Sequence, residues 1–386
     1  MSGLTCVALD LTHAAGLADP ATRARITQLL RDMQGRAPET RFARLEATPS
    51  LAIGARSAAA RLVRRALRTA AIVLPPSAVS AAEALSLVAV YRPGRSKLPT
   101  RVGAQVVFCP AVGPSLHDAG VPLVCGIDSL AFVAHPESFD VQEASVRGYL
   151  LHRALRLAAR VVCPSEFVRG EVLAMAERVD PGRVRVIRPG MPASAPASSP
   201  ELLSQLGLIQ DEFLLCPGPF VGYQNHRMLL MAFGQYRASQ PGSRLKLACL
   251  GCDGDDLPIL EQSVKRMRLV DSVILRSEPA DGLYLACRGV ILPQVYEASG
   301  LTALIAMAVG VPVLSSGAGA LREVIAEAGV SFDPRLPRSL IEAIALADRA
   351  PEGYRALGGR GRARFGQVSR GLSHAEQHLR LLAEVA

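Results

Sequence analysis

A carboxylate beside a glycine turn is the feature of this sequence best suited to chemistry. Glu297 follows an apolar run and lies just before Ser299-Gly300-Leu301-Thr302, after which a stretch of small residues begins. A glycine turn that opens a helix presents unpaired backbone N–H groups and the positive end of the helix dipole, which bind phosphate. The nearby carboxylate can accept hydrogen bonds from hydroxyl groups. The pattern therefore predicts a site for a diphosphate-linked sugar.

The elements around this turn alternate between strand and helix. Apolar, β-branched runs predict strands over 6–11, 105–109, 121–127, 161–164 and 184–187, then over 213–217, 245–251, 272–275, 290–293, 311–315 and 329–332. Helical patterns lie between them, over 22–34, 147–159, 200–206, 227–237 and 257–267. Strands separated by helices favour parallel sheets with right-handed crossovers. The expected fold class is therefore α/β.

The length predicts two domains, because 386 residues exceed one compact core. A linker rich in Pro, Ala and Ser over 191–200 separates an N-terminal domain, 1–190, from a C-terminal domain, 201–365. Residues 366–386 are expected to form a helix that crosses back to the first domain. We expect two Rossmann-like domains that face each other across a cleft, with ligands at the carboxyl ends of the strands.

The charge makes nucleic acid, an anionic membrane and a phosphorylated substrate the candidate partners, because the net charge is +9. Aromatic residues make up only 4% with no Trp, which argues against a surface that stacks nucleic-acid bases. Arg61, Arg64 and Arg65 lie at helical spacing, which indicates either contact with an anionic bilayer or a solvated helix face. With no long apolar run and no signal-peptide pattern, we expect a cytoplasmic protein, peripheral at the membrane if these arginines bind it.

The cysteines give little indication of metal or redox chemistry. Eight are scattered along the chain, most of them within or beside apolar runs. Cys249 and Cys252 form a single C-x-x-C without a second pair or a histidine nearby in the sequence. We interpret the cysteines as structural and expect neither a metal site nor a cofactor.

Several motifs follow one another in a recognisable order: Ser165-Glu166-Phe167, Arg188-Pro189-Gly190-Met191, Gly218 to Phe233 and Tyr296-Glu297 to Pro312. This order resembles the group 1 (family 4) retaining glycosyltransferases, which have two Rossmann-like domains and the GT-B fold. The resemblance extends from about Val106 to Phe365. It implies a nucleotide-sugar donor in the second domain and an acceptor facing the first. It also implies catalytic roles for Glu297 and Asp128 and donor binding by Gly218, Asn225, Ser299, Gly300, Leu301 and Thr302.

The sequence departs from this family's pattern at four functional positions. Tyr223 and Gln224 stand where an Arg and a Lys clamp the donor diphosphate, and Ile305 stands where a Glu binds the ribose. Asp128 occupies the position of the active-site His. Two functions remain open: a glycosyltransferase acting on a glycan or lipid-linked acceptor in cell-surface polysaccharide assembly, or a catalytically silent homologue that is the partner or scaffold of an active transferase. A nucleic-acid-binding protein is a third reading, which rests on charge alone.

Overall fold

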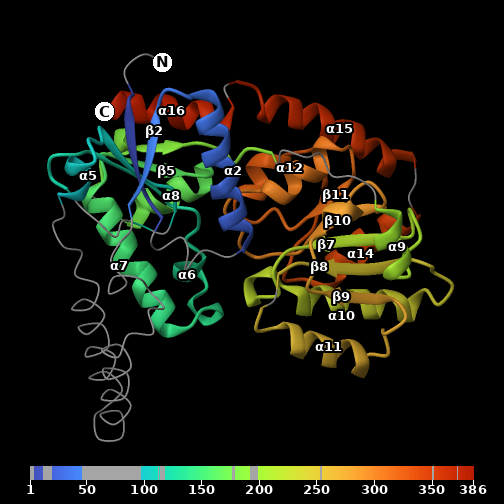
Figure 1. Ribbon diagram of the computed structural model, residues 1–386. Helices are drawn as coiled ribbons and strands as arrows, with labels where there is room; N and C mark the ends of the chain where they lie inside the picture. The colour runs from blue at the N-terminus through green and yellow to red at the C-terminus, as the bar shows by residue number, and fades with distance from the viewer. Residues whose placement is uncertain are drawn as a thin grey trace, which may run out of the picture. The chain divides into compact units, whose positions relative to one another are not determined.

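The computed structural model describes residues 4–11, 20–45, 97–111, 113, 118–175, 179–191, 199–252, 254–349, 352–371 and 373–386 (Figure 1). The arginines at 61, 64 and 65 and most of the linker predicted at 191–200 lie outside these residues. The chain divides into two compact units. The first combines Met1–Gly190 with Leu372–Ala386, and the second is Met191–Gly371.

The first unit is built on a six-stranded parallel sheet of order β2-β1-β3-β4-β5-β6. Its strands are β1 (Cys6–Asp10), β2 (Arg41–Leu45), β3 (Val106–Cys109), β4 (Leu123–Gly126), β5 (Arg160–Cys163) and β6 (Val184–Val186). Nearly all residues of β1, β3, β4 and β5 are buried, as expected for strands covered on both faces. The edge strand β2 was not predicted. Only Leu45 of its five residues is buried, so it lacks the apolar run that marks a central strand.

The helices of the first unit are α2 (Pro20–Arg36), α5 (Leu98–Arg101), α6 (Ala131–Ala134), α7 (Val141–Leu157), α8 (Glu166–Met175) and α16 (His374–Val385). Short 3₁₀ turns lie at Pro136–Ser138 and Pro181–Arg183. The α7 helix begins six residues before the predicted pattern, because Asp140 caps it: the carboxylate accepts hydrogen bonds from the backbone N–H groups of Gln142 and Glu143.

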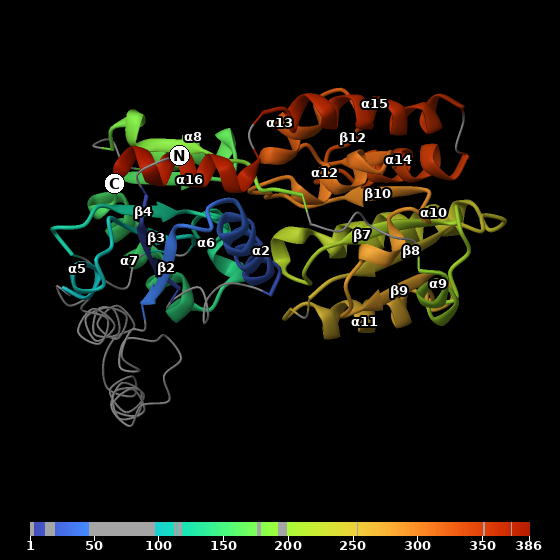
Figure 2. The ribbon, with the colours of Figure 1, turned by 45° about the horizontal axis from the view of Figure 1, so that its top comes forward.

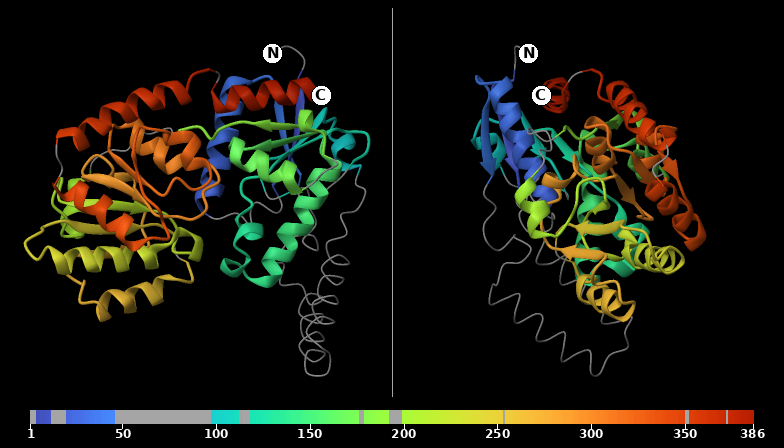
Figure 3. Two further views of the ribbon diagram at one scale, coloured as in Figure 1. Left: turned by 180° about the vertical axis from the view of Figure 1, so that it is seen from behind. Right: turned by 90° about the vertical axis from the view of Figure 1, so that its right-hand side faces the viewer.

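The last helix, α16, belongs to the first unit although it follows the whole second unit in the sequence. It packs against α2, and Figure 3 shows the two side by side. A capping box of Ser373 and Glu376 starts the helix. Leu379 and Leu382 complete a core that also contains residues of β1 and β3. The predicted C-terminal helix at 366–386 differs at its start, because residues 366–368 end α15 of the second unit.

The second unit holds another six-stranded parallel sheet, of order β12-β11-β10-β7-β8-β9 (Figure 2). Its strands are β7 (Phe213–Pro217), β8 (Lys246–Leu250), β9 (Val273–Arg276), β10 (Gly289–Leu292), β11 (Val313–Ser315) and β12 (Val330–Ser331). Two apolar clusters fill the two faces of this sheet. The sheets in both units confirm the predicted α/β class with Rossmann-like parallel sheets.

Helices cover both faces of the second sheet. One cluster takes side chains from α10 (His226–Ser239), α11 (Leu257–Arg266) and α14 (Pro337–Arg349). The other takes them from α9 (Pro200–Gln205), α12 (Leu301–Ala308) and α13 (Ala320–Ile325). The long α15 (Glu352–Val368) packs on α12, and 3₁₀ turns lie at Gly222–Gln224 and Asp281–Leu283. No helix in the described part of the chain is long and apolar enough to span a bilayer.

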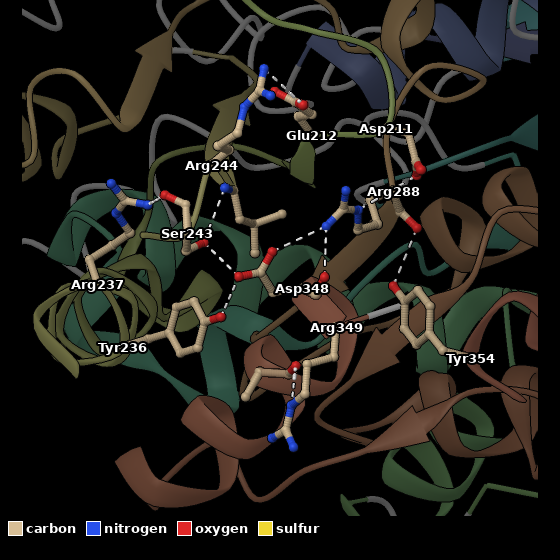
Figure 4. Close-up of polar contacts among 12 residues, drawn as sticks. Asp211, Glu212, Tyr236, Arg237, Ser243, Arg244, Arg288, Asp348, Arg349 and Tyr354 are labelled. Carbon is tan, nitrogen blue, oxygen red and sulfur yellow. Dashed lines mark hydrogen bonds and ion pairs between the residues drawn. The ribbon is translucent and has the colours of Figure 1, made fainter. Parts of the chain in front are cut away.

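A polar network closes the amino-terminal edge of the second sheet (Figure 4). The carboxylate of Asp348, near the end of α14, accepts hydrogen bonds from the hydroxyls of Tyr236 and Ser243. Its other oxygen lies 3.1 Å from Nη1 of Arg288, the residue just before β10, and the same nitrogen donates to the Asp348 carbonyl at 2.9 Å. The Tyr354 hydroxyl donates to the Arg288 carbonyl at 3.3 Å. This network joins α10, α14, α15 and β10 at the edge opposite the candidate site.

Candidate functional site

The predicted donor residues lie at the carboxyl-terminal edge of the second sheet. All six strands are parallel, so the loops that follow β7, β10 and β11 meet at this edge. Glu297 is in the loop after β10, and Gly300 is the N-cap of α12. Gly218 and Asn225 are in the loop after β7. The fold therefore brings the predicted donor residues of this unit to one edge.

Glu297 binds the turn that follows it. Its Oε1 accepts hydrogen bonds from the Ser299 backbone N–H at 3.0 Å, the Ser299 hydroxyl at 3.1 Å and the Gly300 N–H at 2.9 Å. The Leu301 N–H donates to the Ser299 hydroxyl oxygen at 3.3 Å. The hydrogen bonds donated by the turn thus take the place of water around this carboxylate oxygen. A phosphate placed on the Gly300 amide would compete with Glu297 for that N–H.

Gln294 positions the carboxylate, although no motif in the sequence singles it out. The side chain is buried, and its Nε2 donates to Oε2 of Glu297 at 3.2 Å. The carbonyl of Gln294 accepts from the Ser316 hydroxyl at 2.6 Å, which joins the loops after β10 and β11. The sequence does contain one signal for this role, because Gln294 is an amide side chain that directly follows an apolar strand and Pro293.

Gly300 is required by geometry. Its φ of +70° is in the left-handed region, which favours glycine. A Cβ atom at this position would lie 2.8 Å from Cγ2 of Val324 on α13, closer than a side chain can approach. The Ala320 N–H at the start of α13 also donates to the Glu297 carbonyl at 2.9 Å. Arg322, exposed on the first turn of α13, is therefore carried close to this loop.

Asn225 braces the site through its side chain. Its Nδ2 donates to the carbonyls of Pro293 and Pro334, both at 3.0 Å, and its φ is +62°. The asparagine therefore ties the loop after β7 to the loops after β10 and β12. Gly218 is tightly confined, because a Cβ atom there would lie 3.0 Å from Oε1 of Gln224. Both predicted donor residues shape the backbone of this edge.

The three departures in the second unit bring no charge to this edge. Tyr223 stacks edge to face with Tyr296, with ring centroids 6.3 Å apart, and its carbonyl accepts from the Val295 N–H. Gln224 is buried, and Ile305 lies in the apolar cluster under α12. These three positions therefore offer a diphosphate no cation.

Asp128 is in the first unit, in the loop after β4. It lines a small cavity of about 20 Å³ together with Ser129, Phe132 and Arg147 from α7. Arg147 also pairs with Glu143 at 2.8 Å, and its guanidinium carbon lies 5.8 Å from the centroid of the Phe139 ring. A cavity of this size holds about one water molecule. Asp128 thus shares a confined, largely apolar pocket with the Arg147 guanidinium group.

Comparison with known proteins supports the resemblance. Residues 211–347 match the family described as "Glycosyl transferases group 1". The O-antigen chain mannosyltransferase B of Escherichia coli is 30% identical over 194 residues, which cover 48% of this chain and 50% of that protein. The chain spans about half the length of the curated relatives it matches.

Solved structures with the same fold cover nearly the whole chain. Sucrose-phosphate synthase from Thermosynechococcus elongatus superposes with a TM-score of 0.67 at 19% identity, covering 99% of both chains. Anabaena Alr3699/HepE in complex with UDP-glucose has a TM-score of 0.66 at 16% identity, covering 98% of this chain and 99% of the other. At this identity the likeness shows the fold. Residues 211–347 are thus similar to the group 1 glycosyltransferases, and the chain shares the GT-B fold of these solved structures.

Proposed function

We propose that this protein transfers a sugar from a nucleotide-diphosphate donor to a glycan or lipid-linked acceptor during polysaccharide or glycolipid synthesis. The observation that carries the proposal is the Glu297 carboxylate held by the Ser299–Gly300 turn inside the matched group 1 domain. The similarity to an O-antigen mannosyltransferase supports the acceptor class. The fold shared with a protein that binds UDP-glucose supports the donor class.

The roles of the residues follow from their positions. Glu297 would accept hydrogen bonds from the donor sugar, and the start of α12 would meet the diphosphate through its N–H groups and dipole. Arg322 would stabilise the leaving diphosphate, because its helix, α13, begins with an N–H that binds the Glu297 carbonyl, whereas Arg227 already pairs with Asp256 at 2.5 Å. Asp128 would orient the acceptor. Retention of anomeric configuration is part of the proposal and rests on the family resemblance.

A second function is favoured by two observations in the same site. Ile305 is packed in the core and offers the donor ribose no acceptor, and the Gly300 amide already donates to Glu297. Both weaken a donor site that also lacks cations at Tyr223 and Gln224. The alternative is a catalytically silent homologue that is the partner or scaffold of an active transferase.

Calorimetric titration with nucleotide diphosphates and their sugars separates the two functions. The wild type should bind weakly, in the range of tens of micromolar to millimolar, because amide and dipole contributions dominate. Glu297→Ala should weaken binding of the sugar nucleotide. It should preserve or strengthen binding of the bare diphosphate, since it releases the Gly300 N–H. Glu342→Ala, an exposed change on α14, is the matched control. No binding of any nucleotide by the wild type would favour the silent homologue.

The membrane role of Arg61, Arg64 and Arg65 is a separate proposal that rests on sequence spacing. It would place the protein at the cytoplasmic face of a membrane. Co-sedimentation with vesicles should require anionic lipid and weaken as salt is added, because screening shortens the range of the attraction. Equal pelleting by a variant with all three residues changed to Ala would show that they form only a solvated face.

A further inference from the structure

A buried group of three metal-ligating side chains lies beneath the loop after β7. The Sγ atoms of Cys216 and Cys249 and a ring nitrogen of His226 all lie within 4.8 Å of one another. Cys216 and Cys249 are paired in register on the parallel strands β7 and β8, and His226 is the first residue of α10. All three residues are at most 3% exposed. The sequence showed no histidine beside the C-x-x-C pair, because His226 reaches Cys249 only through the fold.

His226 is the observation that points to a ligand. Both of its ring nitrogens are buried, and neither has a hydrogen-bond partner in the part of the chain that the structure describes. An imidazole in an apolar core normally pairs at least one nitrogen, because an unsatisfied buried polar group costs about 1–3 kcal/mol. Its ring packs 5.1 Å from the Phe220 ring, centroid to centroid. A cation bound to one nitrogen would satisfy it.

The chemistry of the two thiols fits the same ligand. Thiolates are the form that binds metal. Two thiolates and a neutral imidazole around Zn²⁺ would carry no net charge, which suits a site inside an apolar cluster. Soft sulfur ligands also select Cu⁺.

We propose that Cys216, Cys249 and His226 form a binding site for a thiophilic cation, either Zn²⁺ or Cu⁺. Loading with Zn²⁺ releases the two thiol protons and involves no change of oxidation state. Cys216 and His226 flank the segment 217–225, which contains Gly218 and Asn225. A bound cation would therefore clamp both ends of the loop that shapes the proposed donor site. The Cys252 side chain lies outside the group of three, although it completes the C-x-x-C.

Elemental analysis of the full-length, untagged protein prepared under reducing conditions tests the site. The metal-free protein is then titrated with Zn²⁺, Cu⁺ or Co²⁺. We expect one equivalent of Zn²⁺ or Cu⁺ per chain, and the titrations identify which of the two binds tightly. We also expect thiolate-to-cobalt charge-transfer absorption with Co²⁺. Cys216→Ser, Cys249→Ser and His226→Leu should each abolish binding, whereas Cys252→Ser, the matched control, should retain it.

Three results would overturn the proposal. The first is a wild-type protein that takes up no cation while all eight thiols are reduced, and this result does not depend on whether any variant folds. The second is a thiol count that reveals a Cys216–Cys249 disulfide in the protein as isolated. The third is equal loss of binding in Cys252→Ser, which would assign the metal to the C-x-x-C pair. None of these readouts depends on glycosyl transfer.

Discussion

Replacing Asp348 by Ala should destabilise the second unit strongly. The carboxylate accepts hydrogen bonds from Tyr236 and Ser243 and pairs with Arg288. The side chains of Asp348 and Arg288 are each only 16% exposed. Water can therefore replace few of the hydrogen bonds that the substitution removes. An acidic residue near the end of a helix opposes the helix dipole, by about 0.3–1 kcal/mol. Its presence at the end of α14 is therefore explained by the network around it.

The size of the effect follows from the contacts. A hydrogen bond from a neutral hydroxyl contributes about 1 kcal/mol, and one between charged groups about 1.5–3 kcal/mol. Removing one partner of a buried ion pair costs about 3–5 kcal/mol, and partial exposure here lowers that figure. We expect a loss of about 3 kcal/mol. In a unit of this size, that corresponds to a fall in melting temperature of about 6–12 °C.

Hydrogen–deuterium exchange and denaturant unfolding measure the effect, and exchange localises it because it reports on individual peptides. Peptides from β7, β8 and β10 should lose protection in Asp348→Ala, while those from the first unit keep it. Glu342→Ala is the matched control on the same helix, because its pair with Arg338 is 64% and 91% exposed. It should cost less than about 1 kcal/mol. Equal losses in the two variants would refute the reasoning.

Three further changes test other parts of the fold. Burial lowers the pKa of His378 on α16 to about 4 and that of the neighbouring His374 to about 3. Each imidazole should therefore cost the first unit about 2 kcal/mol between pH 7 and pH 5, because the unfolded chain gains a proton there that the folded chain does not. Acid unfolding curves should show this slope, and His378→Phe should remove about half of it. Burial, with the hydrogen bond to Asp348, raises the pKa of Tyr236 to about 12. The stability that the neutral Tyr236 hydroxyl contributes to the second unit is therefore present below pH 10 and lost as the pH rises through 12. Tyr236→Phe should remove that alkaline loss in the same type of measurement. Gly300→Ala should lower the free energy of unfolding by about 2–4 kcal/mol, because of the left-handed φ and the contact with Val324. Gly366→Ala, in open space on α15, is the control and should raise the free energy of unfolding by up to about 1 kcal/mol. Thermal unfolding measures both changes.

The sequence predicted the central strands because burial on both faces leaves continuous apolar runs, as in β1 and β7. It missed β2, whose five residues include Arg41 and Arg44, because an edge strand need not be apolar. It also did not separate the three helices α14, α15 and α16 within the polar tail. Their boundaries depend on caps such as Ser373 and on packing partners far away in the sequence.

The candidate site was predictable only in part. The glycine turn and its carboxylate are local in sequence, so their presence beside each other at the start of a helix could be anticipated from spacing. That Glu297 would bind the turn itself could not, because the direction of a side chain depends on Gln294 and the loop after β11. The buried group of Cys216, His226 and Cys249 lay beyond sequence reasoning for the same reason. Its members are separated by at least ten residues and meet through strand pairing.

The return of α16 to the first unit has a consequence for biosynthesis. The core of that unit takes Leu379 and Leu382 from α16, so it lacks these side chains until α16 leaves the ribosome. The second unit, which is continuous from Met191 to Gly371, can close earlier. At about 5–20 residues per second, the first sheet waits roughly 10–35 s for its missing helix. During that interval the nascent chain exposes the apolar surface that Leu379 and Leu382 later cover, both to chaperones and to other nascent chains. The order of folding is then the reverse of the order of synthesis.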